Sequence, residues 1–529
     1  MKRKLLALAL LVATVLTLAP AVMAEEDGPL TPYDPVIEIL TPGGYSPNMF
    51  FAEGESYEDN FVTRFYEEKL GTRYSPKWMV DSSQGTQTLD LAIATNDLPD
   101  MFQVNALTLA KLHAADQIED ITDLIEKYAT DDLLAILNYQ DGRGFLTATF
   151  DGRVFGLPIS NDFANNLPMM YYRKDWLDTL GKDVPVTLED MLDVARAMRD
   201  NIEGCTVPYA LEGEYLGWSG TEFKAIANAN NAYYDCWIPD GNGGLIFRNV
   251  APEMKDALKT LQDMYAEGLL DPEFGVRDQG KIAEDVAAGK VGIFAGVFWN
   301  PLWPLAGSLE NDPEADWVAA PIMTNKDGVL KPQNTIFAYD WVVVRKGFEH
   351  PEALLKSMNF WFECFHGQYA DQLNDLLSTE KYMPAADNWH GNGKPVFFSH
   401  PEKNLRLSDN YMEARQANDP SLLKTGEARN RWEIWQAGGP QGWAHATFLM
   451  VAEPVLHAYT DVQYNEYLGA PTETMMLREA NLIKLTKETF VKIIMGESID
   501  AFDSYVEKWN DQGGAQITEE VNAWYQSVQ

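Results

Sequence analysis

Short apolar runs alternate with segments of helical periodicity along most of the chain. Residues 36–40 form the first run, and the turn-rich stretch 41–45 follows it. Apolar positions around Phe61, Phe65 and Leu70 then repeat at helical spacing and stop at Gly71. A strand, a glycine loop and a helix in this order predict an α/β layer architecture.

The same alternation continues further along the chain. Residues 291–294 and 341–344 are short apolar runs bounded by turn or charged residues, which predicts buried strands. Thr187 stands where an N-cap would, and Asp190 follows three residues later, so a capped helix is predicted there. No internal repeat or long linker appears, and we therefore expect interleaved domains. One helix face near the end is marked by Phe502, Tyr505, Val506 and Trp509.

The first residues have the three-part layout of a secretory signal peptide. Three basic residues precede the apolar run 5–18, and small residues follow before Glu25. We expect cleavage after Ala24, so residues 1–24 are excluded from the fold. The apolar run is short of the roughly 20 residues that span a bilayer. The mature protein is therefore expected to be secreted and soluble, in a periplasm or a cell-wall zone.

Composition and charge narrow the class of protein. The chain has 529 residues, of which 46% are hydrophobic, so two or more domains are expected. A net charge of −38 repels nucleic acid and anionic lipid, and no nucleic-acid partner is expected. The odd number of cysteines leaves one disulfide possible. None follows the leader directly, so a lipobox cysteine is missing; the three are Cys205, Cys236 and Cys364.

Motifs of common enzymes are missing. The 7 histidines form no HExxH, which argues against a zinc hydrolase, and no phosphate-binding GxxxxGK[ST] is present. Residues 217–221 lack the final glycine of a nucleophile elbow. With 79 acidic residues, a carboxylate pair can always be chosen, so a secreted glycoside hydrolase stays an alternative. We expect no enzyme activity, no cofactor and no metal.

Several strings in the mature chain carry a family resemblance. Residues 151–158, DGRVFGLP, resemble DGKxYGLP, and residues 91–100 resemble a loop ending in DLPD. Residues 265–274, YAEGLLDPEF, are similar to YxEGLIDPEF, and 287–294 are similar to AGKVGMF. These are signatures of extracellular solute-binding protein family 1, the sugar-binding components of ABC importers. The tail from residue 493 resembles the large, LplA-like branch of that family.

The resemblance implies the class II periplasmic-binding-protein fold. This fold is α/β, with two lobes of mixed, mostly parallel sheets joined by hinge strands. Residues 33–162 and 340–400 are expected to form lobe 1, and residues 163–339 and 401–529 lobe 2. The implied partners are a carbohydrate ligand, held between the lobes, and the transmembrane subunits of an ABC permease. The protein is expected to be a monomer.

The ligand site is expected at the carboxyl ends of strands, where open α/β sheets bind ligands. Aromatic rings would cover the C–H faces of a sugar while Asp and Asn bond its hydroxyls. Trp299 and Trp303 are the expected stacking platforms; for every candidate, ordinary packing or turn chemistry is the alternative. A peptide or polyamine ligand also stays open. The candidates are Tyr45, Asn96, Asp97, Asp162, Trp218, Trp299, Trp303, Tyr339, Asp340 and Trp443.

Overall fold

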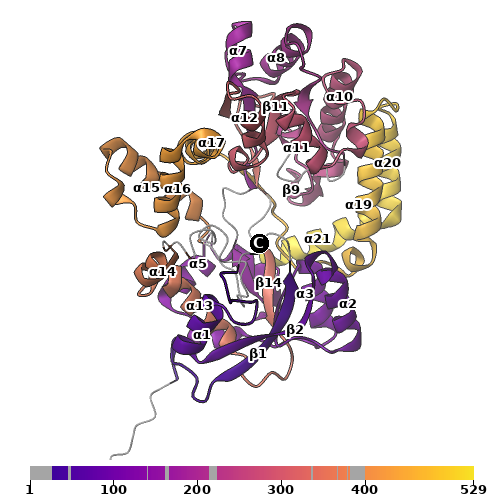
Figure 1. The fold of residues 1–529 in the computed structure, drawn as a ribbon. Coiled ribbons are helices and arrows are strands. Elements are labelled where there is room, and N and C mark those ends of the chain that lie inside the picture. The colour runs from indigo at the N-terminus through magenta and orange to yellow at the C-terminus, as the bar shows by residue number, and fades with distance from the viewer. Residues whose placement is uncertain are drawn as a thin grey trace, which may run out of the picture.

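The computed structural model describes most of residues 27–529 as two lobes of helices and sheet (Figure 1). The expected signal peptide and the candidates Asp162 and Trp218 lie outside the described residues. Within the described part, no helix is long and apolar enough to cross a membrane. The described residues are 27–45, 49, 51–139, 141–160, 166–213, 223–334, 338–365, 367–377, 379, 381 and 400–529.

Lobe 1 is built on two small sheets joined through one aspartate. The backbone amide of Asp100 donates to the carbonyl of Leu40, and its carboxylate accepts from the Leu40 amide, both at 2.8 Å. The first sheet pairs two parallel strands, β1 (Ile37–Tyr45) and β2 (Thr72–Asp81). The second has the order β3 (Met101–Val104), β14 (Ala338–Val344) and β6 (Leu157–Ser160).

The central strand of lobe 1 has a core on each face. Val342 and Val344 join one buried cluster, and Trp341 and Val343 join another, because successive side chains of a strand point to opposite faces. Helices and a small hairpin complete the lobe: α1 (Phe61–Leu70), α2 (Gly85–Thr95), α3 (Ala106–Ala114), α4 (Thr122–Tyr128), α5 (Asp131–Leu137), α6 (Arg143–Leu146), β4 (Thr149–Phe150), β5 (Arg153–Val154), α13 (Ala353–Phe365) and α14 (Ala370–Leu377).

Lobe 2 surrounds one sheet and one large apolar core. The strand order is β12 (Trp317–Pro321), β7 (Met169–Arg173), β11 (Val291–Gly296) and β8 (Val207–Ala210). Arg173 ends β7 and holds the corner to the next helix through Asp175, at 2.6 Å. The earlier helices are α7 (Lys174–Leu180), α8 (Leu188–Asn201), α9 (Phe223–Ala229), α10 (Pro252–Ala266), α11 (Gln279–Ala287) and α12 (Ala306–Asn311).

The last quarter of the chain, residues 400–529, packs on the same core. Helices α19 (Glu473–Ile494) and α20 (Ala501–Trp509) run along one side of lobe 2, and α21 (Ala515–Val528) extends toward the space between the lobes (Figure 1). The remaining elements are β9 (Trp237–Pro239), β10 (Leu245–Phe247), β13 (Gln333–Asn334), α15 (Lys403–Ala417), α16 (Gly426–Ala437), α17 (Gly439–Thr447), α18 (Glu453–Leu456) and β15 (Gln463–Tyr464).

Among the described elements, three consecutive pairs lie in different lobes, and each pair marks a passage of the chain between the lobes: β6 and β7, β13 and β14, and α14 and α15. The strands β7 and β14 each follow a passage, so they start at the edge that faces the other lobe. They therefore run against their neighbours, whereas β8, β11 and β12 run in one direction. The expected bilobal α/β fold with mixed sheets is confirmed. Most strands of each main sheet run in one direction, but the hydrogen-bonded pairs that β7 and β14 form are antiparallel.

Local signals in the sequence predicted two helix ends correctly and the extent of one strand wrongly. The Thr187 side chain caps α8, and the Thr187 backbone amide donates to the Asp190 carboxylate at 3.0 Å. Gly71 ends α1 in a left-handed conformation. The stretch 41–45, expected to be a loop, belongs to β1 because it pairs with β2 through a register shift beside Pro42. All three cysteines are free and buried, and burial raises the pKa of the Cys205 thiol to about 12.

Candidate functional site

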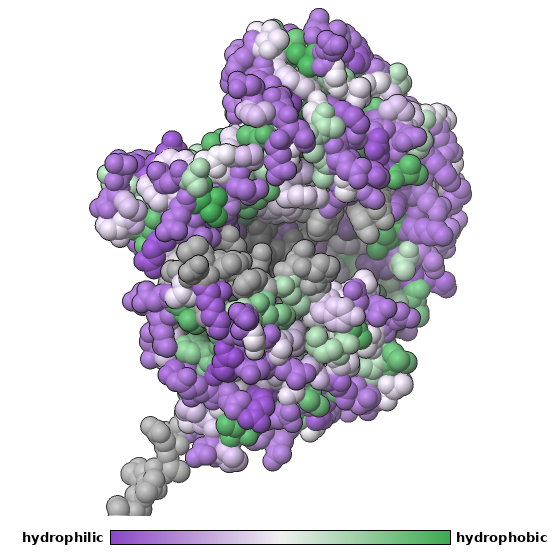
Figure 2. Space-filling model, viewed as in Figure 1, coloured by the Kyte–Doolittle hydropathy of each residue, from purple (hydrophilic) through white to green (hydrophobic). Residues whose placement is uncertain are grey.

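The edges of the two sheets that face the other lobe bring most candidate segments together. In lobe 1, β1, β3 and β6 end at this edge and β14 begins there; in lobe 2, β8, β11 and β12 end there. Figure 2 shows the surface hollowed between the lobes. Side chains that follow these strand ends can therefore reach a molecule held between the lobes.

A buried asparagine fixes the loop after β11 in lobe 2. The Asn300 side chain accepts from the Val297 amide at 2.5 Å and donates to the Trp303 carbonyl at 3.1 Å. A Cβ on Gly296 would stand 2.2 Å from the Asn300 oxygen, so only glycine fits at the end of the strand. Trp299 and Trp303 are thus presented by a rigid turn.

Three tryptophans lie on neighbouring segments of this edge. Trp303 is 42% exposed, and Trp299 is half-buried against the core of lobe 2. Trp443 is also half-buried, on α17, which packs against the short helical segment Pro301–Leu305. Although glycines lie close to Trp443 in the sequence and are typical of loops, the helix begins at Gly439 and includes Trp443. Lobe 2 therefore contributes aromatic surface.

An ionic cluster joins α15, α16 and α17. Glu427 accepts from Lys403 at 2.7 Å and from Arg431 at 2.9 Å, and Arg431 also contacts the Nδ1 of His445 at 3.0 Å. Burial opposes the charge of Glu427, but the two cations lower its pKa to about 2. Burial and the nearby Arg431 lower the pKa of His445 to about 4. His445 is therefore neutral at physiological pH.

Lobe 1 presents polar groups at its edge. Tyr45 ends β1 with 53% of its surface exposed, and the carboxylate of Asp340 accepts from Gln103 Nε2 at 2.5 Å. Tyr339 and Asp340 were expected before the strand, but β14 begins at Ala338 and contains both. At this edge, the Asp340 carboxylate is in a position to accept a hydrogen bond from a ligand hydroxyl.

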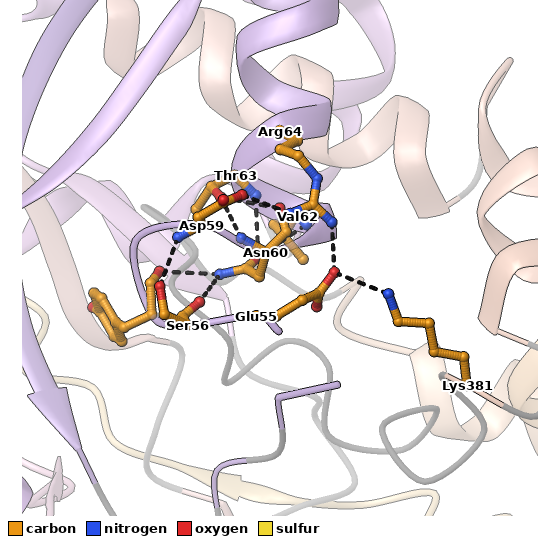
Figure 3. Close-up of polar contacts among 9 residues, drawn as sticks. Glu55, Ser56, Asp59, Asn60, Val62, Thr63, Arg64 and Lys381 are labelled. Carbon is orange, nitrogen blue, oxygen red and sulfur yellow. Dashed lines mark hydrogen bonds and ion pairs between the residues drawn. The ribbon is translucent and has the colours of Figure 1, made fainter. Parts of the chain in front are cut away.

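A hydrogen-bond network holds the segment that leads from this edge into α1 (Figure 3). The buried Asn60 amide donates to the carbonyls of Ser56 and Tyr57, both at 3.0 Å, while its oxygen accepts from two amides of α1. Arg64 binds the nearly buried Glu55, which also lies 3.8 Å from Lys381. Hydrogen bonds thus fix this part of lobe 1, as those of Asn300 fix the turn of lobe 2, whereas Trp299 and Trp443 of lobe 2 also rest on an apolar core.

Two candidates lie away from this edge. Asn96 caps the end of α2 in a left-handed conformation and accepts from Gln117 at 3.0 Å. Asp97 pairs with Lys77 at 2.6 Å. Both precede β3, so they stand at the end of that strand opposite to Val104. The structure does not bring this pair to the interlobe edge, and its contacts are those of a helix end.

A separate cavity of about 550 Å³ lies beside the start of β14 and is lined by both lobes. Its charged residues include Asp235 and Glu479, which were not among the sequence candidates. Asp235 lies just before β9, the first strand of the hairpin that β9 and β10 form. Only the tertiary contact with α19 reveals the cavity. Among the described residues, no group of His, Cys, Asp and Glu could hold a metal ion.

Known proteins share this architecture. Lipoprotein LipO of Bacillus subtilis is 21% identical over 87% of this chain and 88% of its own. The polygalacturonan/rhamnogalacturonan-binding protein YtcQ of the same organism is 22% identical over 86% of each chain. The solved structure of the ABC-transporter substrate-binding protein FusA from S. pneumoniae, in complex with fructo-nystose, has a TM-score of 0.63 and 15% identity, covering 93% of this chain and 99% of that one.

Two α/β lobes, joined by several passages of the chain and facing each other with their strand ends, define a bilobal solute-binding protein. Residues 51–363 match the family of bacterial extracellular solute-binding proteins. The chain belongs to this family. The resemblance read from the sequence strings is thereby confirmed.

Proposed function

We propose that the protein captures a carbohydrate, most simply an oligosaccharide, between its lobes and delivers it to the membrane subunits of an ABC importer. Capture is reversible and proceeds by closure of the lobes over the ligand. No catalytic step is part of the proposal. The proposed contacts are Trp299, Trp303 and Trp443 from lobe 2, Tyr45, Tyr339 and Asp340 from lobe 1, and Asp162 and Trp218 from outside the described residues.

The observation that carries the proposal is the contrast between the two facing edges. Lobe 2 presents Trp303, which is 42% exposed on a rigid turn, with two further tryptophans on neighbouring segments. Lobe 1 presents Asp340 and Tyr45. A sugar ring has apolar faces and a rim of hydroxyls, so stacking from one lobe and hydrogen bonds from the other would suit it.

The relatives support the same ligand class. YtcQ is named for binding polygalacturonan and rhamnogalacturonan, and FusA was solved with fructo-nystose. These names belong to distant relatives, so they favour a glycan without selecting one. The proposal includes secretion with cleavage after Ala24, residence in a periplasm or cell-wall zone without a lipid-modified cysteine, and action as a monomer.

A thermal-shift screen of the mature protein against glycans tests the proposal. The panel contains monosaccharides, neutral and uronic oligosaccharides, peptides and polyamines. A ligand present at 100 times its Kd stabilises the folded state by about 2.7 kcal/mol, so one glycan class should raise the melting temperature clearly.

Other outcomes separate the alternatives. A shift with a peptide or polyamine and none with any glycan would overturn the carbohydrate assignment while keeping the importer. Release of reducing ends from a bound oligosaccharide would support a glycoside hydrolase instead. A glycan that binds and is recovered intact agrees with the proposal.

A further inference from the structure

The cavity beside the start of β14 stands apart from the aromatic edge. Gly144 and Trp341 line it from lobe 1, and Asp235, Trp237 and Glu479 line it from lobe 2. Trp341 and Asp340 are neighbours in β14, so their side chains point to opposite faces of the sheet. None of the sequence candidates lines this cavity. It is a separate place where both lobes contact the same space.

We propose that this cavity is a second binding site, which takes a small protonated amine carrying an apolar or sugar-ring body. The site lies between the hairpin β9–β10, helix α19 and the β14 face of lobe 1. It is independent of whether the ligand of the main cleft is a carbohydrate.

The carboxylates of the cavity are Asp235 and Glu479. Within the described part of the chain, neither forms a side-chain hydrogen bond or an ion pair. Crowding by protein atoms raises the pKa of Asp235, although the residue is exposed at the cavity, and the charge of Lys224 lowers this pKa only in part. Burial and the charge of Asp235 raise the pKa of Glu479 to about 6. A bound cation would offset this unfavourable charge.

The other cation of the lining is already engaged. Arg143 binds Glu466 at 2.8 Å, with both side chains partly buried. Lys224 also has an interaction of its own, so the two carboxylates leave the cavity negative when both are ionised. A protonated amine matches this charge, whereas an anion would meet the carboxylates directly.

The remaining walls are aromatic and apolar. Phe247 and Trp509 stack with ring centroids 5.3 Å apart, and Trp237 lies against Phe247 at 5.2 Å. All three line the cavity. Aromatic faces attract cations and cover apolar rings, and a few placed polar groups in an apolar pocket are typical of small-ligand sites. The volume, about 550 Å³, is in the range of such sites.

Occupation of this site would be coupled to lobe closure. The residues on the two sides belong to different lobes, and Thr147 of lobe 1 donates to the Leu468 carbonyl of lobe 2 at 3.0 Å beside the cavity. A change in the interlobe angle changes the distance between the walls. An amine that binds more tightly to the conformation with one interlobe angle would therefore shift the population of closed molecules.

Matched ligand pairs test the site directly. Cyclohexylamine is compared with cyclohexanol, and glucosamine with glucose, by thermal shift and calorimetry on the mature protein at pH 7.5. We expect the amines to bind and the neutral partners not to. Glu479→Gln should weaken amine binding about tenfold. Glu488→Gln, the same change on the exposed outer face of α19, is the control and should leave it unchanged.

The binding of the paired ligands decides both the charge of the ligand and the existence of the site. Equal binding of the amine and its neutral partner would overturn the cationic ligand, and no binding of any amine would overturn the site. The comparison of paired ligands on the unmodified protein keeps the test valid if Glu479→Gln is poorly folded. Trp303→Ala should retain amine binding while it weakens glycan binding. Loss of both in that variant would place the amine in the main cleft and contradict a second site.

Discussion

The two facing edges are held in place by different combinations of apolar packing and polar contacts. At lobe 2, Trp299 and Trp443 rest on one large apolar core, and α17 is backed by the charged cluster of Arg431. At lobe 1, Asp340 and the segment capped by Asn60 are held by hydrogen bonds. Apolar packing tolerates little change in shape, whereas hydrogen bonds depend on direction.

This difference suggests a division of roles. A stacking surface needs area and rigidity, which lobe 2 provides through the Asn300 turn. A hydrogen-bonding edge needs correct orientation of a few groups, which lobe 1 provides through networks around β14 and α1. Substitutions in lobe 2 should therefore change the stability of the protein at low pH and the stacking of a ligand. Substitutions in lobe 1 should change the stability that the cap of α1 provides and the polar contacts to a ligand.

The largest effect should come from acid, acting on lobe 2. The pKa of His445 is about 4 in the folded protein, below its ordinary 6.5, so the unfolded chain takes up the proton first. The free energy of unfolding should fall as the pH drops from about 6.5 to about 4, by about 3 kcal/mol at 1.36 kcal/mol per pKa unit. Urea unfolding followed by circular dichroism at pH 7 and pH 4 measures this loss.

Variants assign the acid response to its residue. His445→Gln cannot take up the proton, so its unfolding free energy should depend less on pH over this range. His350→Gln changes a histidine of lobe 1 and serves as the control. An unchanged pH dependence in His445→Gln would show that the charged cluster of lobe 2 is not the acid-sensitive region.

The next largest effect should appear at the lobe 1 edge. Asn60 is fully buried and its side chain makes four hydrogen bonds around the start of α1. Asn60→Ala removes them and leaves buried backbone groups without partners, so we expect a loss of about 2 kcal/mol in the free energy of unfolding. Chemical denaturation measures it.

An exposed cap gives the matched comparison. Thr187 caps α8 at the surface of lobe 2, where water can replace its bond, so Thr187→Ala should cost about 1 kcal/mol or less. Similar losses in the two variants would mean that burial of the Asn60 network adds nothing to the ordinary value of a cap.

Local signals in the sequence predicted much of the fold. The end of α1 at Gly71 and the cap of α8 depend on neighbouring residues alone, and both are confirmed. Short apolar runs predicted the cores of β11 and β14 but not their ends, since pairing with neighbouring strands extends them to Gly296 and Ala338. The first apolar run predicted β1 too short for the same reason, because pairing with β2 extends this strand to Tyr45.

The candidate site was predicted where it depends on a strand and the loop after it. Trp299 and Trp303 follow β11, as their spacing indicated. Asn96 and Asp97 precede a strand instead of following one, and the loop pattern alone does not distinguish the two ends. The cavity of Asp235 and Glu479 joins residues far apart in the sequence, so only tertiary packing reveals it.

A stacking residue tests the aromatic side of the comparison. Trp303→Ala removes an exposed ring, so glycan affinity should fall about tenfold, as loss of about 1.4 kcal/mol implies. Stability should change little, because the side chain is 42% exposed. Calorimetry with the best glycan of the panel measures the affinity, and Leu477→Ala, at an exposed site on α19, is the control. Unchanged affinity in Trp303→Ala would remove this ring from the site.

The smallest effect should come from the polar side. Asp340→Asn keeps the shape of the side chain and an oxygen that accepts from Gln103, but it removes the negative charge. Hydrogen bonds to a charged group exceed those to a neutral one, so we expect glycan affinity to fall about threefold. The enthalpy of binding should become less favourable in the same calorimetric titration. If Asp340→Asn cost more affinity than Trp303→Ala, directed polar contacts would outweigh stacking, and the proposed division of roles between the lobes would be reversed.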